Sequence, residues 1–193
     1  MSASADLVSR GISIRDHFIA ADQVHSLLEC ARARMASGDF APARVGSQGK
    51  AQRREEIRGD FTCWLREPLF AAELALLKQL DDLRLELNRE ATLGLFDLEL
   101  HYAQYPPGAG YARHVDQPLG TTRRRVSLVL YLNTDWEPAH GGVLRIHETD
   151  SVYLDVEPVA GRLVSFLTLG REHEVLPARH ERLSISGWFC GRG

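Results

Sequence analysis

Residues 98–102 read Leu-Glu-Leu-His-Tyr, so that apolar side chains alternate with the polar side chains of Glu99 and His101. A period of two is typical of a β-strand that buries one face. Short apolar runs of the same kind recur toward the C-terminus, separated by turn residues. The expected strands are residues 125–132, 143–147, 152–156, 163–167, 172–176 and 183–189. Many short strands without helices between them predict a sandwich, jelly roll or barrel.

The first third of the chain has a helical period instead. Apolar side chains from Val24 to Met35 fall on one helical face, and Gly38 follows where a C-terminal cap is expected. A second helix is predicted after Pro68, with Leu76, Leu80, Leu83 and Leu87 on one stripe. Between these helices, Ala41–Glu56 is polar or small and has no period. It is interpreted as a long mobile loop, and loops of this length are often functional.

Composition excludes several classes of protein. The chain has 193 residues, of which 44% are hydrophobic, and this suits one domain with its own core. A net charge of −3 gives no basic field for binding nucleic acid. No apolar run is long enough to cross a membrane, and the N-terminal residues do not resemble a secretory signal. The three cysteines are scattered, which favours a reducing cytoplasm over a disulfide framework.

A candidate metal site begins with His114-Val115-Asp116. On an extended strand the side chains at i and i+2 point the same way, so an imidazole and a carboxylate converge there. His173 lies in another expected strand and would complete a set of two histidines and one carboxylate. This set is typical of non-haem iron(II) oxygenases, and zinc is the competing metal. The helical H-E-x-x-H pattern of zinc hydrolases is absent from the sequence.

Arg182 follows His173 by nine residues, across a polar turn, at the start of an apolar strand. An antiparallel return of this length can bring the two side chains next to each other. A guanidinium at this position suits a bidentate hydrogen bond to a ligand carboxylate. A structural ion pair with Asp or Glu is the other interpretation, because a buried arginine needs an anionic partner.

These segments occur together and in order with several others: YPPGAGYARHVD at 105–116, YLNTDW at 131–136, GGVLRI at 141–146, HEVLP at 173–177, and residues 57–64. In this combination the chain resembles the Fe(II)- and 2-oxoglutarate-dependent prolyl hydroxylases of the hypoxia-inducible-factor type and their bacterial relatives. The resemblance implies an α+β, mainly β fold with a double-stranded β-helix (jelly-roll) core. One domain over residues 1–193 is expected, with helical support over about 1–92 and the core over about 93–190.

By position, the resemblance makes His114, Asp116 and His173 the ligands of Fe(2+). It implies that Arg182 binds the distal carboxylate of 2-oxoglutarate, with help from the Tyr131 hydroxyl. The resemblance also assigns several other positions to the binding of the co-substrate or of the polypeptide substrate. Tyr105 and Leu144 match co-substrate contacts, Trp188 matches a position shared with the reacting proline, Arg123 or Arg124 matches an arginine near the substrate peptide, and Arg58 and Asp60 match a charged pair under the substrate loop.

The resemblance implies a prolyl 4-hydroxylase that uses O2 and 2-oxoglutarate, with ascorbate as the supporting reductant. The expected substrate is a protein or peptide, and elongation factor Tu is the leading candidate because some bacterial relatives modify it. A hydroxylase of free amino acids or other small molecules is one alternative, and a non-catalytic jelly-roll sensor is another. Trp64 and Trp136 are interpreted as core or loop-anchoring residues, and Glu174 is expected on the face opposite the metal.

Overall fold

The chain folds into two antiparallel β-sheets and three α-helices, seen in a computed structural model that describes residues 2–44, 54, 57–117 and 123–192. In spatial order, the large sheet contains β1 (Ile12–Arg15), β9 (Leu163–Leu167), β6 (Arg124–Tyr131), β11 (Arg182–Gly191), β4 (Leu95–Tyr105), β3 (Phe61–Trp64) and β2 (Ala41–Pro42). The small sheet contains β5 (Tyr111–His114), β10 (His173–Val175), β7 (Leu144–His147) and β8 (Tyr153–Val156). A short 3-10 helix spans Pro138–His140.

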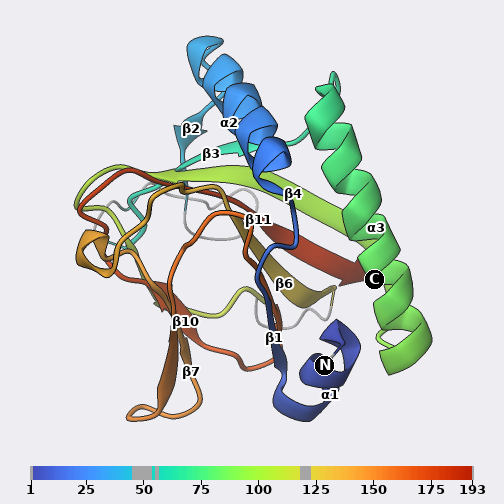
Figure 1. Cartoon of the computed structure of the whole chain (residues 1–193). Coiled ribbons are helices and arrows are strands. Elements are labelled where there is room, and N and C mark those ends of the chain that lie inside the picture. Colours follow the sequence, from blue (N-terminus) through green and yellow to red (C-terminus); the bar gives the residue numbers. More distant parts are fainter. Residues whose placement is uncertain (1, 45–53, 55–56, 118–122, 193) are drawn as a thin grey trace.

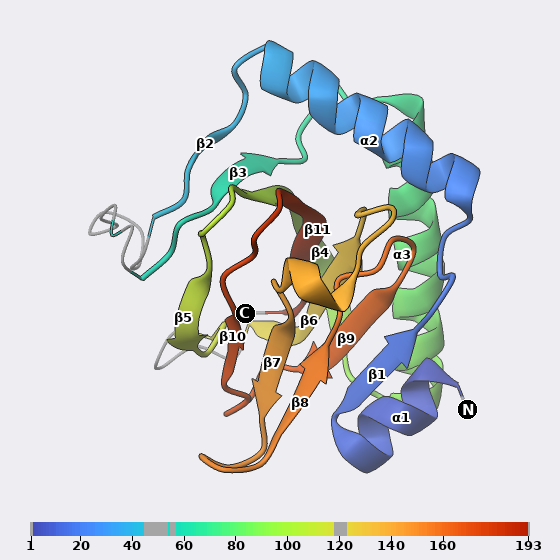
Figure 2. The same cartoon turned by 60° about the vertical axis from the view of Figure 1, so that its left-hand side comes forward.

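The helices cover one face of the large sheet, and the small sheet lies on its other side (Figures 1 and 2). The helices are α1 (Ala3–Arg10), α2 (Ala21–Ala36) and α3 (Ala71–Ala91). One apolar cluster fills the space between the helices and the large sheet, and a second lies between the sheets. This layered arrangement agrees with the mainly β, jelly-roll class that the sequence predicts.

Both predicted helices form. In α3 the stripe of leucines at 76, 80, 83 and 87 is buried against the large sheet. After α2 the chain turns at Gly38, which has φ 76° and donates its amide to the Met35 carbonyl at 3.0 Å. A left-handed residue costs glycine little, so the chain can leave the helix sharply at this point. Among the described residues, no helix has the length and apolar character that a membrane crossing requires.

The first third of the chain is less purely helical than the sequence predicts. Its strands β1, β2 and β3 extend the two edges of the large sheet, so the sheet is not built from residues 93–190 alone. Ala41–Pro42 pairs with β3 and is therefore strand, not loop. Residues 45–53 and 55–56 of the predicted loop lie outside the described residues. These strands are two to four residues long, too short to show a period.

Strand β4 differs from its prediction in a way that matters for the site. The alternation over residues 98–102 predicts one buried and one exposed face, but His101 is only 3% exposed. Leu100 and Tyr102 face the helices, whereas Ala103 and Tyr105 face the small sheet. The second sheet therefore covers the side that the pattern assigns to solvent, and the polar residue on that side becomes part of a buried cavity.

Candidate metal centre

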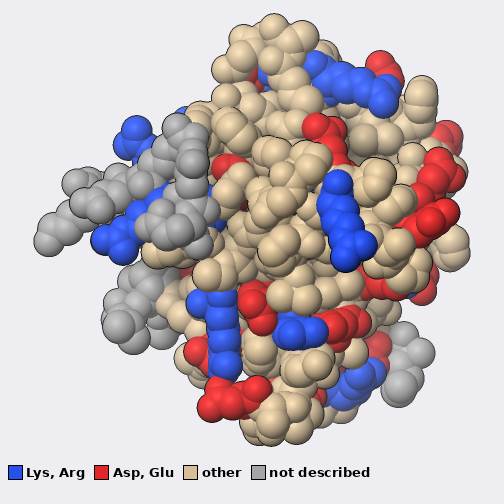
Figure 3. Space-filling model, turned by 90° about the vertical axis from the view of Figure 1, so that its left-hand side faces the viewer, with Lys and Arg blue, Asp and Glu red and all other residues tan. Residues whose placement is uncertain are grey.

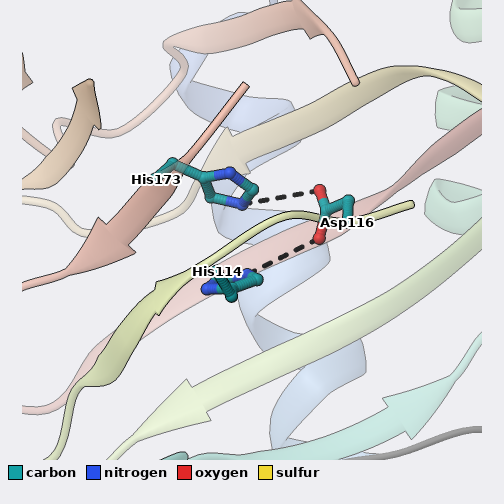
Figure 4. Close-up of side chains that lie close together, drawn as sticks. All are labelled: His114, Asp116 and His173. Carbon is teal, nitrogen blue, oxygen red and sulfur yellow. Dashed lines mark ion pairs between the residues drawn. The ribbon is translucent and has the colours of Figure 1, made fainter. Parts of the chain in front are cut away.

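Three side chains that are predicted as metal ligands meet between the two sheets (Figure 4). Strands β5 and β10 pair antiparallel with His114 directly opposite His173, and the two imidazole centroids lie 4.2 Å apart. Asp116 comes two residues after His114, beyond the end of β5, where a bend turns its carboxylate toward both histidines. Its Oδ1 lies 3.6 Å from His114 Nε2, and its Oδ2 lies 3.5 Å from His173 Nε2.

The backbone fixes which nitrogen of each histidine faces Asp116. His114 Nδ1 lies 2.8 Å from the Ala112 carbonyl oxygen, and His173 Nδ1 lies 3.2 Å from that of Arg171. A carbonyl only accepts a hydrogen bond, so each Nδ1 carries the proton and donates. Each Nε2 then carries no proton, and its lone pair faces the space between the three side chains, where it is available to a metal ion. This orientation of ligating histidines by carbonyl groups is usual in protein metal sites.

The Asp116 carboxylate stays ionised although it is buried. Burial alone would raise its pKa, but electrostatic attraction to the neighbouring imidazoles of His173 and His114 and a hydrogen bond from Ser127 hold that pKa well below its usual range. Ser127 Oγ donates to Oδ2 at 2.6 Å from strand β6. Burial lowers the pKa of His173, against the pull of Asp116, which favours the neutral form that a metal needs. The donor set thus fits a divalent iron ion.

Arg182 lies at the opposite end of the same cavity and is 1% exposed. It is the first residue of β11, opposite Tyr105 of β4, and its Nε donates to the Gly142 carbonyl at 2.9 Å. Its Nη2 is buried and has no hydrogen-bond partner among the described residues, where it also forms no ion pair. A buried guanidinium without an acidic partner disagrees with the structural ion-pair interpretation.

Two tyrosines flank this guanidinium. The Arg182 Cζ atom lies 5.0 Å from the Tyr105 ring centroid and 5.1 Å from that of Tyr131. The Tyr131 hydroxyl is buried and, within the part of the chain that is described, has no hydrogen-bond partner. Burial raises the pKa of both phenols, so both stay protonated and can donate. The unpartnered N–H of Arg182 and the unpartnered O–H of Tyr131 can both donate hydrogen bonds to the carboxylate of a ligand.

The cavity between these two ends contains most of the predicted site residues. It is lined by Arg58, His101, Ala103, Tyr105, Tyr111, His114, Asp116, Leu128, Val129, Leu144, His173, Val175, Arg182, Ser186, Gly187 and Trp188. Leu144 of β7 lies on the wall of this cavity, and its contact with the co-substrate stays a prediction. A hollow bordered by Pro138 and Pro177 lies outside this cavity and contains none of the predicted site residues.

An aromatic group lies at the end of the cavity far from Arg182. The ring of His101 lies 4.9 Å from that of Trp64 and 5.5 Å from that of Trp188. Arg124 covers the other part of Trp188, with its Cζ 3.4 Å from the ring centroid, and reaches the Asp116 carbonyl at 3.2 Å. Trp64 is 40% exposed beside this group and is therefore not a core residue, whereas its interpretation as a loop-anchoring residue stays a prediction.

Of the charged pair predicted under the substrate loop, Arg58 lines the cavity and Asp60 lies behind it. Arg58 donates to both carboxylate oxygens of Asp60, at 2.6 and 3.0 Å. The Arg58 guanidinium lies 4.6 Å above the Tyr111 ring, which in turn stacks on His114 at 3.5 Å between centroids. Tyr111 and His101 were not singled out from the sequence. Tyr111 lies three residues before the predicted ligand His114, and this spacing is the feature of the sequence from which its place at the site could have been predicted.

The structure separates the two arginines that the sequence leaves as alternatives. Arg124 lies against Trp188 at the cavity, as described above. Arg123 points away and pairs with Asp97 at 2.9 Å and Glu99 at 2.6 Å near the surface. On the other side of the metal centre, Glu174 accepts a hydrogen bond from His147 at 3.0 Å, on the face of β10 opposite His173.

Charges of both signs are mixed on the molecular surface. On the face in Figure 3, Lys and Arg side chains lie next to Asp and Glu, without a continuous basic area among the described residues. Arg113, for example, pairs with Asp150 at 2.8 Å and also with Glu172. The phosphates of a nucleic acid would meet charges of both signs on this face.

Comparison with known proteins identifies the family. Residues 100–190 match the 2OG-Fe(II) oxygenase superfamily. The chain is also similar to the crystal structure of a prolyl-4-hydroxylase from Pseudomonas putida, with 46% sequence identity, a TM-score of 0.89, and coverage of 99% of this chain and 98% of the other. The chain belongs to the 2OG-Fe(II) oxygenase superfamily. Membership in this superfamily implies Fe(2+), 2-oxoglutarate and O2, and the donor groups at the two ends of the cavity fit them.

Within the 2OG-Fe(II) oxygenases, the chain is homologous to prolyl hydroxylases. Human Egl nine homolog 1 is 34% identical over 189 residues, which cover 93% of this chain and 43% of that protein. A prolyl hydroxylase from Trichoplax adhaerens, solved with a peptide fragment of the hypoxia inducible factor oxygen degradation domain, is 26% identical with a TM-score of 0.89. The chain spans about half the length of the first curated relatives that it matches.

Proposed function

We propose that this protein is a 2-oxoglutarate- and O2-dependent prolyl 4-hydroxylase that acts on a protein substrate. The observation that carries the proposal is the pair of complementary ends in one buried cavity. One end presents two imidazole Nε2 atoms and a carboxylate, and the other presents Arg182 with unpartnered donor groups. A 2-oxo dicarboxylate is the class of molecule that can contact both ends at once.

In this proposal each side chain has a defined task. His114, Asp116 and His173 hold Fe(2+), and Arg182 and Tyr131 hold the distal carboxylate of 2-oxoglutarate through charge-assisted and neutral hydrogen bonds. Tyr105 and Leu144 limit the space around the co-substrate and exclude water. The bound iron supplies the oxygen activation that these side chains cannot perform themselves. No side chain is required as a general base.

The polypeptide is proposed to enter at the aromatic end of the cavity. There Trp188, with Arg124 across its ring, provides an apolar surface for a prolyl side chain, and Arg58 with Asp60 forms the neighbouring wall. Elongation factor Tu is the proposed substrate. A cytoplasmic location and ascorbate as supporting reductant belong to the same proposal, and three buried free cysteines support a reducing compartment.

The test is an incubation of the purified protein with Fe(2+), ascorbate, labelled 2-oxoglutarate and purified elongation factor Tu. The expected result is succinate release coupled to the gain of one oxygen atom by a prolyl residue, read by peptide mass spectrometry. The Asp116→Ala variant serves as the inactive control. Coupled turnover with free L-proline but not with the protein would support a small-molecule hydroxylase. Binding of 2-oxoglutarate without any succinate would support a non-catalytic sensor.

A further inference from the structure

His101 is a buried polar residue of the cavity for which the proposed chemistry has no use. It is 3% exposed, and it lines the cavity at the end where its ring contacts Trp64 and Trp188. Its Nδ1 atom is buried and has no hydrogen-bond partner among the residues that the structure describes. Buried polar atoms are rarely left unpaired, because each has given up its hydrogen bonds to water. A ligand in the cavity is the natural partner.

The ring of His101 is neutral and offers one donor and one acceptor. Burial, together with the positive charges of Arg58 and Arg124, lowers its pKa to about 3, and Asp116 opposes this only in part. A neutral imidazole carries a single N–H, and either nitrogen can hold it. No described hydrogen bond to Nδ1 fixes the ring, so it can adopt the orientation that a bound ligand requires.

The register of β4 places His101 beyond the reach of the co-substrate. Residues 101, 103 and 105 share one face of the strand, with Tyr105 opposite Arg182 and His101 opposite Ser186. Four residues of strand span roughly 13 Å. A five-carbon dicarboxylate that starts at Arg182 is shorter than this separation. His101 is therefore left to contact the second substrate, which enters from the aromatic end.

The chemistry of proline suits the environment of His101. Proline has no backbone N–H. The backbone at a prolyl residue therefore offers carbonyl oxygens as hydrogen-bond acceptors but no donor. The neighbouring Trp64 and Trp188 rings supply apolar contact for a pyrrolidine ring. A single N–H beside two indoles therefore matches a prolyl residue with its flanking carbonyl better than it matches a charged amino acid.

We propose that His101 positions the polypeptide substrate by donating a hydrogen bond from its ring N–H to a backbone carbonyl next to the reacting proline. The inference rests on the proposed function and adds a specificity-determining residue to it. His101 acts on the orientation of the polypeptide and takes no part in binding iron or 2-oxoglutarate. Loss of the donor therefore affects the use of the protein substrate alone.

The test compares His101→Leu, which removes the donor, with His101→Gln, which keeps an N–H of similar reach. His25→Leu, at an exposed position on α2, is the matched control. With elongation factor Tu as the probe, a lost neutral hydrogen bond predicts a fall in kcat/KM of roughly threefold to tenfold for His101→Leu, mainly through KM. His101→Gln should recover part of this loss. Affinity for 2-oxoglutarate and its turnover without protein substrate should equal wild type in all variants.

Two results would overturn the inference while the proposed function stands. One is a His101→Leu protein with the wild-type KM for elongation factor Tu. The other is a parallel loss of 2-oxoglutarate affinity and uncoupled turnover in both His101 variants, which would make the residue structural. Wild-type protein that leaves every proline of elongation factor Tu unmodified would instead refute the proposed function, and the inference would fall with it. Thermal unfolding of each variant identifies any general loss of folding.

Discussion

At one end of the cavity, His114, Asp116 and His173 contact one another, and carbonyl groups and Ser127 hold them in place. At the other end, the Arg182 guanidinium makes one hydrogen bond through Nε, while its Nη2 and the neighbouring Tyr131 hydroxyl have no partner among the described residues. The first end is organised by the protein itself. The second is a set of buried donors whose acceptor has to come with the ligand.

This difference has an energetic meaning. Removing a group from the self-contained end breaks several contacts and leaves its neighbours misaligned, whereas removing one from the Arg182 end takes away donors for the ligand and, within the protein, the hydrogen bond from Arg182 to Gly142. Metal affinity and 2-oxoglutarate affinity should therefore respond to different substitutions. Four substitutions test this separation, beginning with the one expected to have the largest effect.

Replacing Asp116 by alanine should have the largest effect, because it removes the carboxylate of the ligand set, whose oxygens lie 3.6 Å from His114 Nε2 and 3.5 Å from His173 Nε2. We expect Mn(2+), used in place of Fe(2+), to bind more than about 100-fold more weakly, since even outer groups of metal sites contribute 10–100-fold. Titration calorimetry measures this, with the exposed Asp82→Ala as control. Zinc should occupy the wild-type site and inhibit turnover. Wild-type Mn(2+) affinity in Asp116→Ala would show that the ligand assignment is wrong.

Replacing Arg182 by alanine should act on the co-substrate and not on the metal. A charge-assisted bidentate hydrogen bond contributes about 1.5–3 kcal/mol, so 2-oxoglutarate should bind roughly 10–100-fold more weakly. Lysine should restore part of the affinity, because an ammonium group lacks the planar pair of donors. Anaerobic titration of the Fe(2+) protein, followed by its visible charge-transfer band, measures the change. Exposed Arg179→Ala should behave as wild type. Unchanged affinity in Arg182→Ala would remove the support for a 2-oxoglutarate site.

Replacing Ser127 by alanine tests how far the metal end depends on its surroundings. The change removes the 2.6 Å hydrogen bond to Asp116 Oδ2 and leaves the three ligands in place. We expect about a tenfold loss of Mn(2+) affinity and an unchanged affinity for 2-oxoglutarate in metal-saturated protein. Exposed Ser151→Ala is the control. A loss confined to 2-oxoglutarate binding would contradict the division of the cavity into two ends.

Replacing Tyr131 by phenylalanine should have the smallest effect. It removes one neutral donor near Arg182 and keeps the ring, so 2-oxoglutarate affinity should fall only about threefold to fivefold. The same anaerobic titration detects this change, and Tyr153→Phe on the exposed strand β8 provides the control. If the loss equalled that of Arg182→Ala, the hydroxyl and not the guanidinium would be the main contact.

Much of the fold could be predicted because long elements carry a period. Strands β6, β9 and β11 and helices α2 and α3 formed close to the predicted positions, since each repeats its pattern over several residues. Helix α1 and strands β1 and β3 were missed. They are four to eight residues long, and β1 and β3 are placed by pairing with β9 and β4, which one sequence does not display.

The site was predictable where a pattern or a family motif marks it. His114, Asp116 and His173 meet as the spacing indicates, although Asp116 follows the strand instead of lying on it. The buried position of His101 was not predicted. A polar residue in an alternating strand indicates a solvent face, and only the position of the second sheet shows that this face is a cavity.

Strand β11 carries Arg182 at its first residue and Trp188 six residues later, both on the cavity side, while Leu183 and Ile185 face the helices. It is bonded to β4 and β6 on both sides. A one-residue insertion between Arg182 and Trp188 would turn one of them out of the cavity. Altered connecting loops can therefore reshape the rim of the cavity, but the interval between Arg182 and Trp188 is set by the strand and stays a fixed length.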